Sequence, residues 1–411
     1  MNPRPDKKDT KLFTPSILLF LVSQNLSIFG SSVVGYAIIW YVTLQTSSGT
    51  WMMGVTLATM VPPLLISLNS GVWADRYNRK YLIMLSDGFI AAATFALFLL
   101  FFMGYRQLEL LLAVSVIRSL GSGIQSPAVN AIFPQLVPKE HLTRIQGINQ
   151  SVRSVLLLLS PAVGGVVLSL MNISWAFLLD VISASIAIVV FAFIKVDKTK
   201  RTSEAFSVRK DMREGLSYTF GNPVLKNLIL YYTFAFFLVT PAAILTPLLV
   251  ERSFGPEIWK LTANEIAWTV GSLVGGVFIT IKGQFKDKVR TIALTLVGFG
   301  VGFALLGIAK PFSLYLVVML VVGIFMPILA TAETVLIQEI VEPSKMGRVF
   351  SIVELIVGFS MPIGILIFGP LADIVSIESL LIVSGILLVV VGLLYQRSNR
   401  RMVATTVPGG Q

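Results

Sequence analysis

Long runs of residues without charge are the feature that most constrains how this chain folds. Residues 51–70 contain no charged side chain, and residues 81–103 contain only Asp87. A helix of about 20 apolar residues is long enough to cross the hydrocarbon core of a bilayer. Backbone polar groups find no water there, so each must be paired within its helix or within a closed barrel. The runs are continuously apolar rather than alternating over about ten residues, and they therefore predict spanning helices.

Composition decides how many such helices the chain holds. Charged residues make up 13% of the 411 residues and the mean hydropathy is +0.83, whereas soluble domains are about a quarter charged. We predict an all-α membrane protein with twelve transmembrane helices in two pseudo-symmetric six-helix bundles. The eighth helix is the least regular, because Lys260 and Glu265 interrupt it. The predicted spans are residues 13–44, 51–73, 80–103, 108–136, 142–171, 174–194, 225–249, 259–281, 290–308, 312–337, 346–374 and 377–395.

These spans predict a cytoplasmic tail (1–12), an N-terminal bundle (13–194), a linker (195–224), a C-terminal bundle (225–395) and a second cytoplasmic tail (396–411). Within the linker, Val208, Met212 and Leu216 recur at four-residue spacing with basic residues between them. That pattern is typical of a short amphipathic helix on the inner membrane surface, and a solvated linker is the alternative.

The positions of lysine and arginine predict the orientation. Only four of the 32 are predicted to lie on the outer side of the membrane: Arg106, Arg252, Lys260 and Lys310. Cytoplasmic loops are enriched in these residues, so we predict a multi-pass protein of the bacterial inner (plasma) membrane with both termini in the cytoplasm. The same enrichment accounts for the net charge of +11 without nucleic acid as a partner.

Several kinds of chemistry are excluded by composition. The chain has no cysteine and a single histidine, His141, which rules out disulfides, thiol catalysis and metal sites built from cysteine or histidine. We expect no metal and no cofactor. The phosphate-binding pattern Gly-x4-Gly-Lys-Ser/Thr does not occur, so an ATPase that drove this protein would be a separate chain.

Two short patterns recur in the two halves. Gly123 to Pro127 in the fourth span matches Gly323 to Pro327 in the tenth, because each begins Gly-Ile and ends in Pro. The loops that follow also share a Pro and a later Arg. The recurrence in the same order predicts an internal duplication, a frequent plan of transporters.

The loop between the second and third spans reads Gly71-Val72-Trp73-Ala74-Asp75-Arg76-Tyr77-Asn78-Arg79-Lys80. Its charges are costly to desolvate, so it is predicted to lie at the membrane interface. It resembles the signature G-x-L-A-D-R-x-G-R-K of the major facilitator superfamily, and the resemblance extends over residues 13–395. Trp73 and Asn78 are the two departures; Asn is the residue that best replaces Gly at a positive φ angle.

The resemblance implies an alternating-access transporter in which this loop is a gate. Asp75 would meet the positive N-terminal end of the eleventh span and latch the two halves together on the inside. We expect Asp75→Asn to impair turnover while leaving substrate binding largely intact. The gating residues implied are Gly71, Asp75, Arg76, Arg79, Lys80 and Arg348.

A second motif points within the superfamily. Ser160-Pro161-Ala162-Val163-Gly164-Gly165 in the fifth span resembles the antiporter motif G-P-x-x-G-G of drug exporters, with Ser160 in place of the first Gly. Pro161, Gly164 and Gly165 are its matching residues, and ordinary packing of small residues is the alternative. Three further stretches, Pro138 to Arg144, Arg209 to Gly215 and Gly347 to Ser351, resemble the branch that contains macrolide-efflux proteins and siderophore exporters.

Charged residues within spans are rare and are usually functional. We predict that some of them couple protons or bind substrate, with Glu333→Gln or Glu354→Gln expected to reduce pH-driven transport. Arg118 paired with Asp180, and Arg153 paired with Asp87, are the structural alternatives. The candidates are Arg118, Glu333, Glu354, Asp180, Asp87 and Arg153, and the predicted lining of the substrate cavity includes Gln24, Asn25, Tyr231 and Phe234.

The favoured function is export of amphipathic, drug-like or macrolide-like molecules by proton antiport. The expected partners are the lipid bilayer, a small-molecule substrate and protons, and the expected functional state is a monomer. A dedicated exporter of one metabolite such as a siderophore is the alternative within transport. A membrane enzyme would need a nucleophile, a metal or paired acids near one interface, and no such cluster is evident in the sequence.

Overall fold

The computed structural model describes residues 13–194, 208–343 and 345–406, without the side chains of 67, 68, 72, 75, 139, 208–212 and 400–406. Its residues divide into two compact units by their contacts. Unit 1 comprises Met1–Ala37 and Ala58–Ser203, and unit 2 comprises Ile38–Leu57 and Glu204–Gln411. Residues 195–207 of the predicted linker lie outside the described part.

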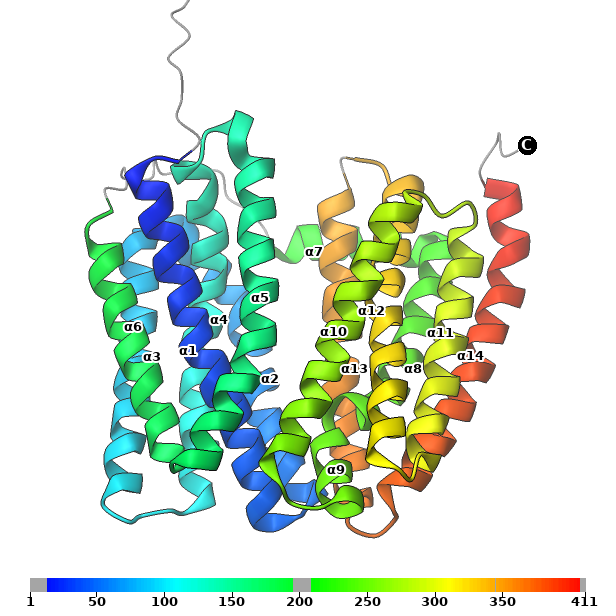
Figure 1. The fold of residues 1–411 in the computed structure, drawn as a ribbon. Helices are drawn as coiled ribbons and strands as arrows, with labels where there is room; N and C mark the ends of the chain where they lie inside the picture. Colours follow the sequence, from blue (N-terminus) through cyan, green and yellow to red (C-terminus); the bar gives the residue numbers. More distant parts are fainter. Residues whose placement is uncertain (1–12, 195–207, 344, 407–411) are drawn as a thin grey trace, which may run out of the picture. The chain divides into compact units, whose positions relative to one another are not determined.

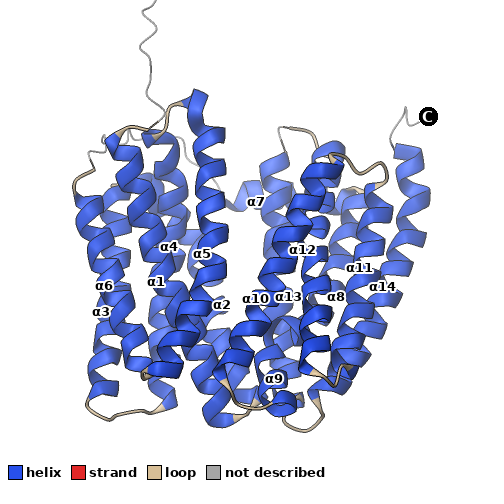
Figure 2. Ribbon diagram, in the orientation of Figure 1, coloured by secondary structure: helices blue, strands red, loops and turns tan. Residues whose placement is uncertain are grey.

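All regular elements of the described residues are helical, as Figure 2 shows. Twelve of these helices are long and apolar enough to cross a membrane, which agrees with the predicted fold class. The first half of the chain forms α1 (Pro15–Thr46), α2 (Gly49–Arg76), α3 (Arg79–Phe102), α4 (Leu108–Leu136), η1 (Lys139–His141), α5 (Leu142–Leu170) and α6 (Ile173–Ala192). The second half forms α7 (Val208–Gly221), α8 (Pro223–Ile244), α9 (Thr246–Phe254), α10 (Ile258–Lys282), α11 (Lys288–Ile308), α12 (Phe312–Ile340), α13 (Met346–Leu371) and α14 (Ile377–Thr406).

Aromatic and aliphatic side chains close the core of unit 1. Phe20 of α1 packs edge-on against Phe133 of α4 at 5.7 Å between ring centroids, and at 6.1 Å from Phe191 of α6. All three rings are at least 90% buried. Aromatic pairs of this geometry add to the stabilisation that burial gives, so this cluster ties α1 to α4 and α6.

Unit 2 packs α11 against both α12 and α14, and α8 against α13 and α14 (Figure 1). The largest differences from the predicted spans of unit 2 are in two helices. The single span predicted over residues 225–249 ends at Ile244, because Pro247 lies in the first turn of α9 and a proline removes a backbone donor. The helix predicted to end at residue 395 continues to Thr406 as the last part of α14.

The glycines of the repeated pattern occupy matching helix crossings. A Cβ atom on Gly123 of α4 would lie 2.5 Å from Ile66 and 2.9 Å from Pro63 of α2. A Cβ atom on Gly323 of α12 would lie 2.4 Å from the Trp268 carbonyl of α10. Each glycine thus lets the fourth span of its half approach the second span of that half. Equivalent crossings of this kind are expected of two halves that arose by duplication.

Candidate functional site

An apolar cavity of about 150 Å³ lies inside unit 2. Aromatic, aliphatic and methionine side chains of six helices, α8 to α13, form most of its wall. Its lining residues are Ala235, Phe236, Val239, Ala242, Ala243, Thr246, Asn264, Glu265, Trp268, Leu296, Phe299, Phe303, Leu306, Met319, Met326, Leu329 and Met361. Methionine is flexible and polarizable, so a wall of this kind adapts to apolar guests of different shape.

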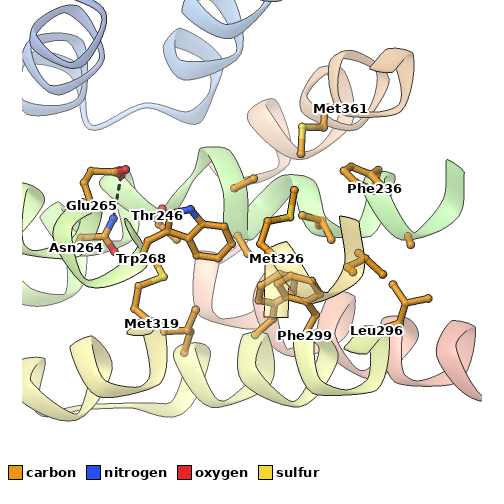
Figure 3. A pocket seen from close by; sticks show the side chains of 17 residues that line it. Phe236, Thr246, Asn264, Glu265, Trp268, Leu296, Phe299, Met319, Met326 and Met361 are labelled. Carbon is orange, nitrogen blue, oxygen red and sulfur yellow. Dashed lines mark hydrogen bonds between the residues drawn. The ribbon is translucent and has the colours of Figure 1, made fainter. Parts of the chain in front are cut away.

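Glu265 is the charged residue among those that line this cavity. Figure 3 shows its carboxylate beside Asn264, whose Nδ2 donates a hydrogen bond to Glu265 Oε1 at 3.1 Å. The Oδ1 of Asn264 in turn accepts a hydrogen bond of 2.8 Å from the hydroxyl of Tyr315 on α12. The tyrosine therefore orients the amide, and the amide orients the carboxylate toward the cavity.

The position of Glu265 follows from the packing of α10. A Cβ atom on Gly271 or Gly275 would lie 2.0 Å or 2.3 Å from backbone carbonyls of α12, so both glycines are needed for the close contact. Lys260, one and a half turns before Glu265, turns back to the end of the helix. It binds the Phe254 carbonyl and the Glu257 carboxylate. The lysine thus lies at the helix end, while Glu265 faces inward.

The sequence prediction missed this acid as a site residue. Its signal in the sequence is the charge that interrupts the eighth span. The predicted cavity residues of α8 also lie elsewhere. Phe234 is exposed, with 56% of its surface accessible, and Tyr231 packs edge-on against Tyr395. Phe236 and Val239 line the cavity instead.

A second, polar pocket of about 460 Å³ lies inside unit 1. It is formed by α1, α4 and α5, and its wall combines amide side chains and Arg153 with apolar residues. The lining residues are Phe20, Gln24, Val129, Asn130, Phe133, Pro134, Leu142, Thr143, Gln146, Asn149, Gln150 and Arg153. Asn25, predicted with Gln24 to line a cavity, donates to Asn149 Oδ1 at 3.0 Å and so supports this wall from behind.

Arg118 and Asp180 form a buried ion pair in unit 1. The guanidinium of Arg118 on α4 contacts Asp180 of α6 and the hydroxyl of Thr94 on α3. The Asp180 side chain is fully buried and also accepts a hydrogen bond of 3.2 Å from Ser31 of α1. The pair therefore links four helices, the arrangement given above as the structural alternative.

Asp87 has different partners from those considered in the sequence. Its Oδ1 accepts hydrogen bonds of 2.7 Å from Ser27 of α1 and from Gln125 of α4. Among the ion pairs of the described residues, none joins Asp87 to Arg153. Arg153 instead lines the polar pocket.

The two predicted acids of the second half lie in unlike surroundings. Glu333 of α12 is partly buried and lies near enough to Tyr232 and Tyr395 to interact with them electrostatically. Glu354 of α13 is exposed in unit 2. Neither residue lines the apolar cavity.

The α2–α3 loop holds the C-terminal ends of helices within unit 1. Arg79 donates to the carbonyls of Ala74 at 2.9 Å and Ala131 at 2.8 Å. Lys80 Nζ donates to the carbonyls of Ala192 and Ile194 at the end of α6, at 2.6 Å and 2.8 Å. Cations at helix C-termini are stabilised by the helix dipole.

Asn78 does not need the positive φ angle expected of the glycine it replaces. Its φ is −68°, and its side chain accepts a hydrogen bond from the Lys80 amide as the N-cap of α3. Arg76 is exposed, and a Cβ atom on Gly71 would meet nothing within 4 Å. The Asp75 side chain, on which the latch prediction depends, lies outside the described side chains.

Arg348, predicted to reinforce that latch, donates to Glu214 of α7 at 3.0 Å. Lys345 lies 4.4 Å above the ring of Tyr218, also on α7. The amphipathic helix of the linker thus packs on α13 through two charged residues.

Pro161, Gly164 and Gly165, the matching residues of the antiporter motif, are buried on α5.

The loop between α1 and α2, which belongs to unit 2, is held by the end of α13. Asp373 accepts hydrogen bonds from the Gly49 amide at 2.6 Å, the Thr50 amide at 2.9 Å and the Thr50 hydroxyl at 2.7 Å. Arg252 of α9 binds Asp373 at 3.2 Å and the Ala372 carbonyl at 2.6 Å. We call this set of contacts the tip clamp.

The tip clamp stabilises the ionised form of Asp373. Burial acts to raise the pKa of Asp373, but hydrogen bonds from the Thr50 hydroxyl, the Thr50 and Gly49 amides and the Ser48 hydroxyl outweigh it and lower the pKa to about 2. Hydrogen bonds to the ionised form favour that form.

No group of three or more potential metal ligands occurs among the described residues.

Comparison with known proteins identifies the family. Residues 15–406 match the family described as transmembrane secretion effector. Macrolide efflux protein A of Streptococcus pyogenes is 28% identical over 380 residues, which cover 92% of this chain and 94% of that protein. The staphyloferrin A transporter of Staphylococcus aureus is 22% identical over 398 residues, covering 95% of this chain and 96% of that protein.

A solved structure supports the same fold. The crystal structure of a bacterial homologue of the iron transporter ferroportin, in an inward-facing state, has a TM-score of 0.73. Its sequence is 16% identical, and the match covers 93% of this chain and 98% of that one. The family and these relatives are transporters rather than enzymes, as the sequence predicts. Since the family match extends through both halves, the chain belongs to the transmembrane secretion effector family of major facilitator transporters.

Proposed function

We propose that this protein exports amphipathic small molecules across the bacterial plasma membrane by proton antiport and alternating access. The observation that carries the proposal is the apolar cavity of unit 2 with a single carboxylate, Glu265, in its wall. A cavity of about 150 Å³ with apolar walls accepts a group of the size of benzene. The lipophilic part of a drug-like molecule would enter this space.

Glu265 gives the cavity a means of coupling. A carboxylate surrounded by apolar side chains is costly unless it is protonated or paired with a cation. Its described hydrogen bond comes from the neutral amide of Asn264. A proton and a cationic cargo group would therefore compete for the same carboxylate, which is the exchange that antiport requires. The names of the efflux relatives support the direction of transport.

The topology that completes the proposal has both termini in the cytoplasm, and the proposed functional unit is the monomer. Asp75 retains its proposed role as the inner latch. A dedicated exporter of one polar metabolite is the second candidate, because the pocket of unit 1 carries several amide side chains and Arg153 in its wall.

Efflux assays test the proposal in a bacterium from which the major pumps have been deleted. We expect the wild type to lower the accumulation of lipophilic amines, and an uncoupler to abolish the effect. In proteoliposomes, Glu265→Gln should reduce amine-driven proton release at least tenfold. Glu339→Gln is the matched control, because this exposed acid of α12 binds Lys288 at 2.6 Å and does not line the cavity.

Parallel measurements on Glu333→Gln and Glu354→Gln test whether one of these acids, rather than Glu265, couples proton movement to transport. If Glu265→Gln transports like the wild type while Glu333→Gln does not, the coupling acid is Glu333 and the assignment to the cavity is wrong. If uncoupler leaves export of every compound unchanged, proton antiport is wrong.

A further inference from the structure

The polar pocket of unit 1 holds donor groups that lack acceptors. Gln24 is buried, with 4% of its surface exposed, and its Nε2 has no hydrogen-bond partner among the described residues. The same holds for the buried Nε of Arg153. Both side chains line the pocket. Unsatisfied buried donors are destabilising, and more so when charged, so the pocket favours an occupant that supplies acceptors.

The depth of Arg153 strengthens this argument. It lies about 17 Å along α5 from Leu142, at 1.5 Å per residue, and so about halfway through a spanning helix. Thr143, Gln146 and Gln150 precede it at spacings of three, four and three residues, which places all four on one face. A stripe of this polarity is costly against lipid and implies an aqueous or ligand-filled space.

The charge of Arg153 has no counterpart in the pocket wall. The residues that line the pocket include no carboxylate. Among the described side chains of unit 1, the buried acids Asp180 and Asp87 have other partners: Asp180 binds Arg118, and Asp87 accepts from Ser27 and Gln125. The Gln24 amide can turn to present either its donor or its acceptor, whereas a guanidinium can only donate. The wall therefore selects an anion.

We propose that this pocket binds an anionic oxygen group, a carboxylate or a phosphate, with Arg153 and Gln24 as donors and Asn149 holding the wall in place. The inference rests on the proposed function, because the transported molecule is the natural carrier of such a group. An arginine fork matches two oxygens of one carboxylate or phosphate. The protein would then recognise cargo with an acidic group as well as an apolar part.

Two fluorescent dyes form a matched pair of probes. Rhodamine 110 carries a carboxylic acid, and rhodamine 123 is its methyl ester. Fluorescence anisotropy would measure both dissociation constants with the full-length protein in dodecyl maltoside at pH 7.5. We expect the wild type to bind rhodamine 110 about tenfold more tightly, because hydrogen bonds to a charged carboxylate are stronger than hydrogen bonds to a neutral ester.

The variants assign that preference to the pocket. Arg153→Gln should abolish it while leaving rhodamine 123 binding within twofold, and Gln24→Glu should reverse it. Arg144→Gln is the matched control, because it removes a positive charge from the same helix without touching the pocket. Arg153→Lys keeps the positive charge and should retain part of the preference for rhodamine 110. It provides a second test of the site if Arg153→Gln does not fold.

Several results would overturn the inference. These are equal affinity of the wild type for the two dyes, no binding of either dye, a preference that survives in Arg153→Gln, or an equal loss of both dyes in that variant. If neither dye binds while efflux persists in cells, the inference fails and the proposed function stands. If the dyes are discriminated while no compound is exported, the pocket stands and the proposed function fails.

Nanodiscs identify the source of the anionic group. If phosphatidylglycerol displaces rhodamine 110 from the wild type and phosphatidylcholine does not, the group is a lipid phosphate. If neither lipid competes, the group belongs to a soluble cargo. In this experiment, displacement by phosphatidylglycerol that is equal for Arg153→Gln and the wild type contradicts the anion site.

Discussion

Buried charges in this protein fall into two kinds at the residue scale. The Arg118–Asp180 pair is internally satisfied, with exposures of 10% and 0% and further bonds from Thr94 and Ser31. Removing one partner of such a pair costs about 3–5 kcal/mol, because the other charge is left buried. Glu265 and Arg153 instead border cavities and have fewer partners than their charge requires. The second kind is available for ligands and protons.

Asp373 provides a pH-dependent prediction at the same scale. Its folded pKa of about 2 lies below the usual value of about 3.9. A lowered pKa contributes stability that is fully present above the unfolded value and is lost as the pH falls through the folded value. The contribution of Asp373 should therefore be constant from pH 5 to 8 and should decline between about pH 4 and pH 2.

Thermal unfolding followed by tryptophan fluorescence measures this contribution. Asp373→Ala should lower the apparent stability by about 1–2 kcal/mol at pH 7, as expected for a lost helix cap, and the difference should shrink below pH 4. Glu257→Gln is the control, because this exposed acid lies outside the clamp. A difference that persists unchanged down to pH 2 would contradict the assignment of the cap to the ionised carboxylate.

Close helix crossings place the functional groups at the element scale. Gly271 and Gly275 bring α10 against α12 and so set Glu265 beside Asn264 and the Tyr315 hydroxyl. Gly215 does the same for α7, since its Cβ atom would lie 2.7 Å from Ile352 and 3.2 Å from the Cβ of Arg348. The linker helix is thereby fixed to α13.

Gly215→Val should release α7 from α13, because a branched side chain has no room at this crossing. The Arg348–Glu214 contact would be lost with it, and amide hydrogen exchange across residues 213–221 should become about tenfold faster, equivalent to about 1.4 kcal/mol. Gly221→Ala is the matched control in the same helix, because its Cβ atom would meet nothing within 4 Å. Unchanged exchange in Gly215→Val would show that α7 does not depend on this contact.

In the whole molecule, the two compact units are not two continuous halves of the chain. The end of α1 and the start of α2, Ile38–Leu57, belong to unit 2. The tip clamp is the physical reason, because Asp373 and Arg252 satisfy the orphan backbone groups of the α1–α2 loop. Alternating access, as proposed, requires this loop to leave unit 2 once in every transport cycle.

A reversible disulfide tests that requirement. The chain has no cysteine, so Ser48→Cys with Asp373→Cys introduces the sole pair, at side chains whose oxygens lie 2.9 Å apart. Oxidation should reduce transport in proteoliposomes at least tenfold, and dithiothreitol should restore it. The control is Ser253→Cys with Glu378→Cys, a hydrogen-bonded pair of unit 2 outside the tip (2.6 Å). Full transport by the oxidised Ser48–Asp373 pair would exclude opening at the tip.

Much of the architecture was predictable from the sequence because its determinants are local. Continuous apolar runs specify spanning helices, and proline and polar residues specify their ends. The repeated Gly123 and Gly323 patterns predict a duplication, and both glycines lie where the fourth span of a half crosses the second span of that half. The break between α8 and α9 was missed, although Pro247 was its signal, because apolar composition alone does not reveal where the backbone bends.

The number, order and lipid character of the spanning helices follow from the sequence alone, because hydrophobic length and backbone pairing are properties of each segment. Which polar residues meet depends on the tertiary fold. It paired Arg118 with Asp180, gave Asp87 to Ser27 and Gln125, and left Arg153 at a polar pocket and Glu265 at an apolar one. The physical reason is that a helix presents residues to different neighbours according to its rotation and depth, and both are set by contacts distant in the chain.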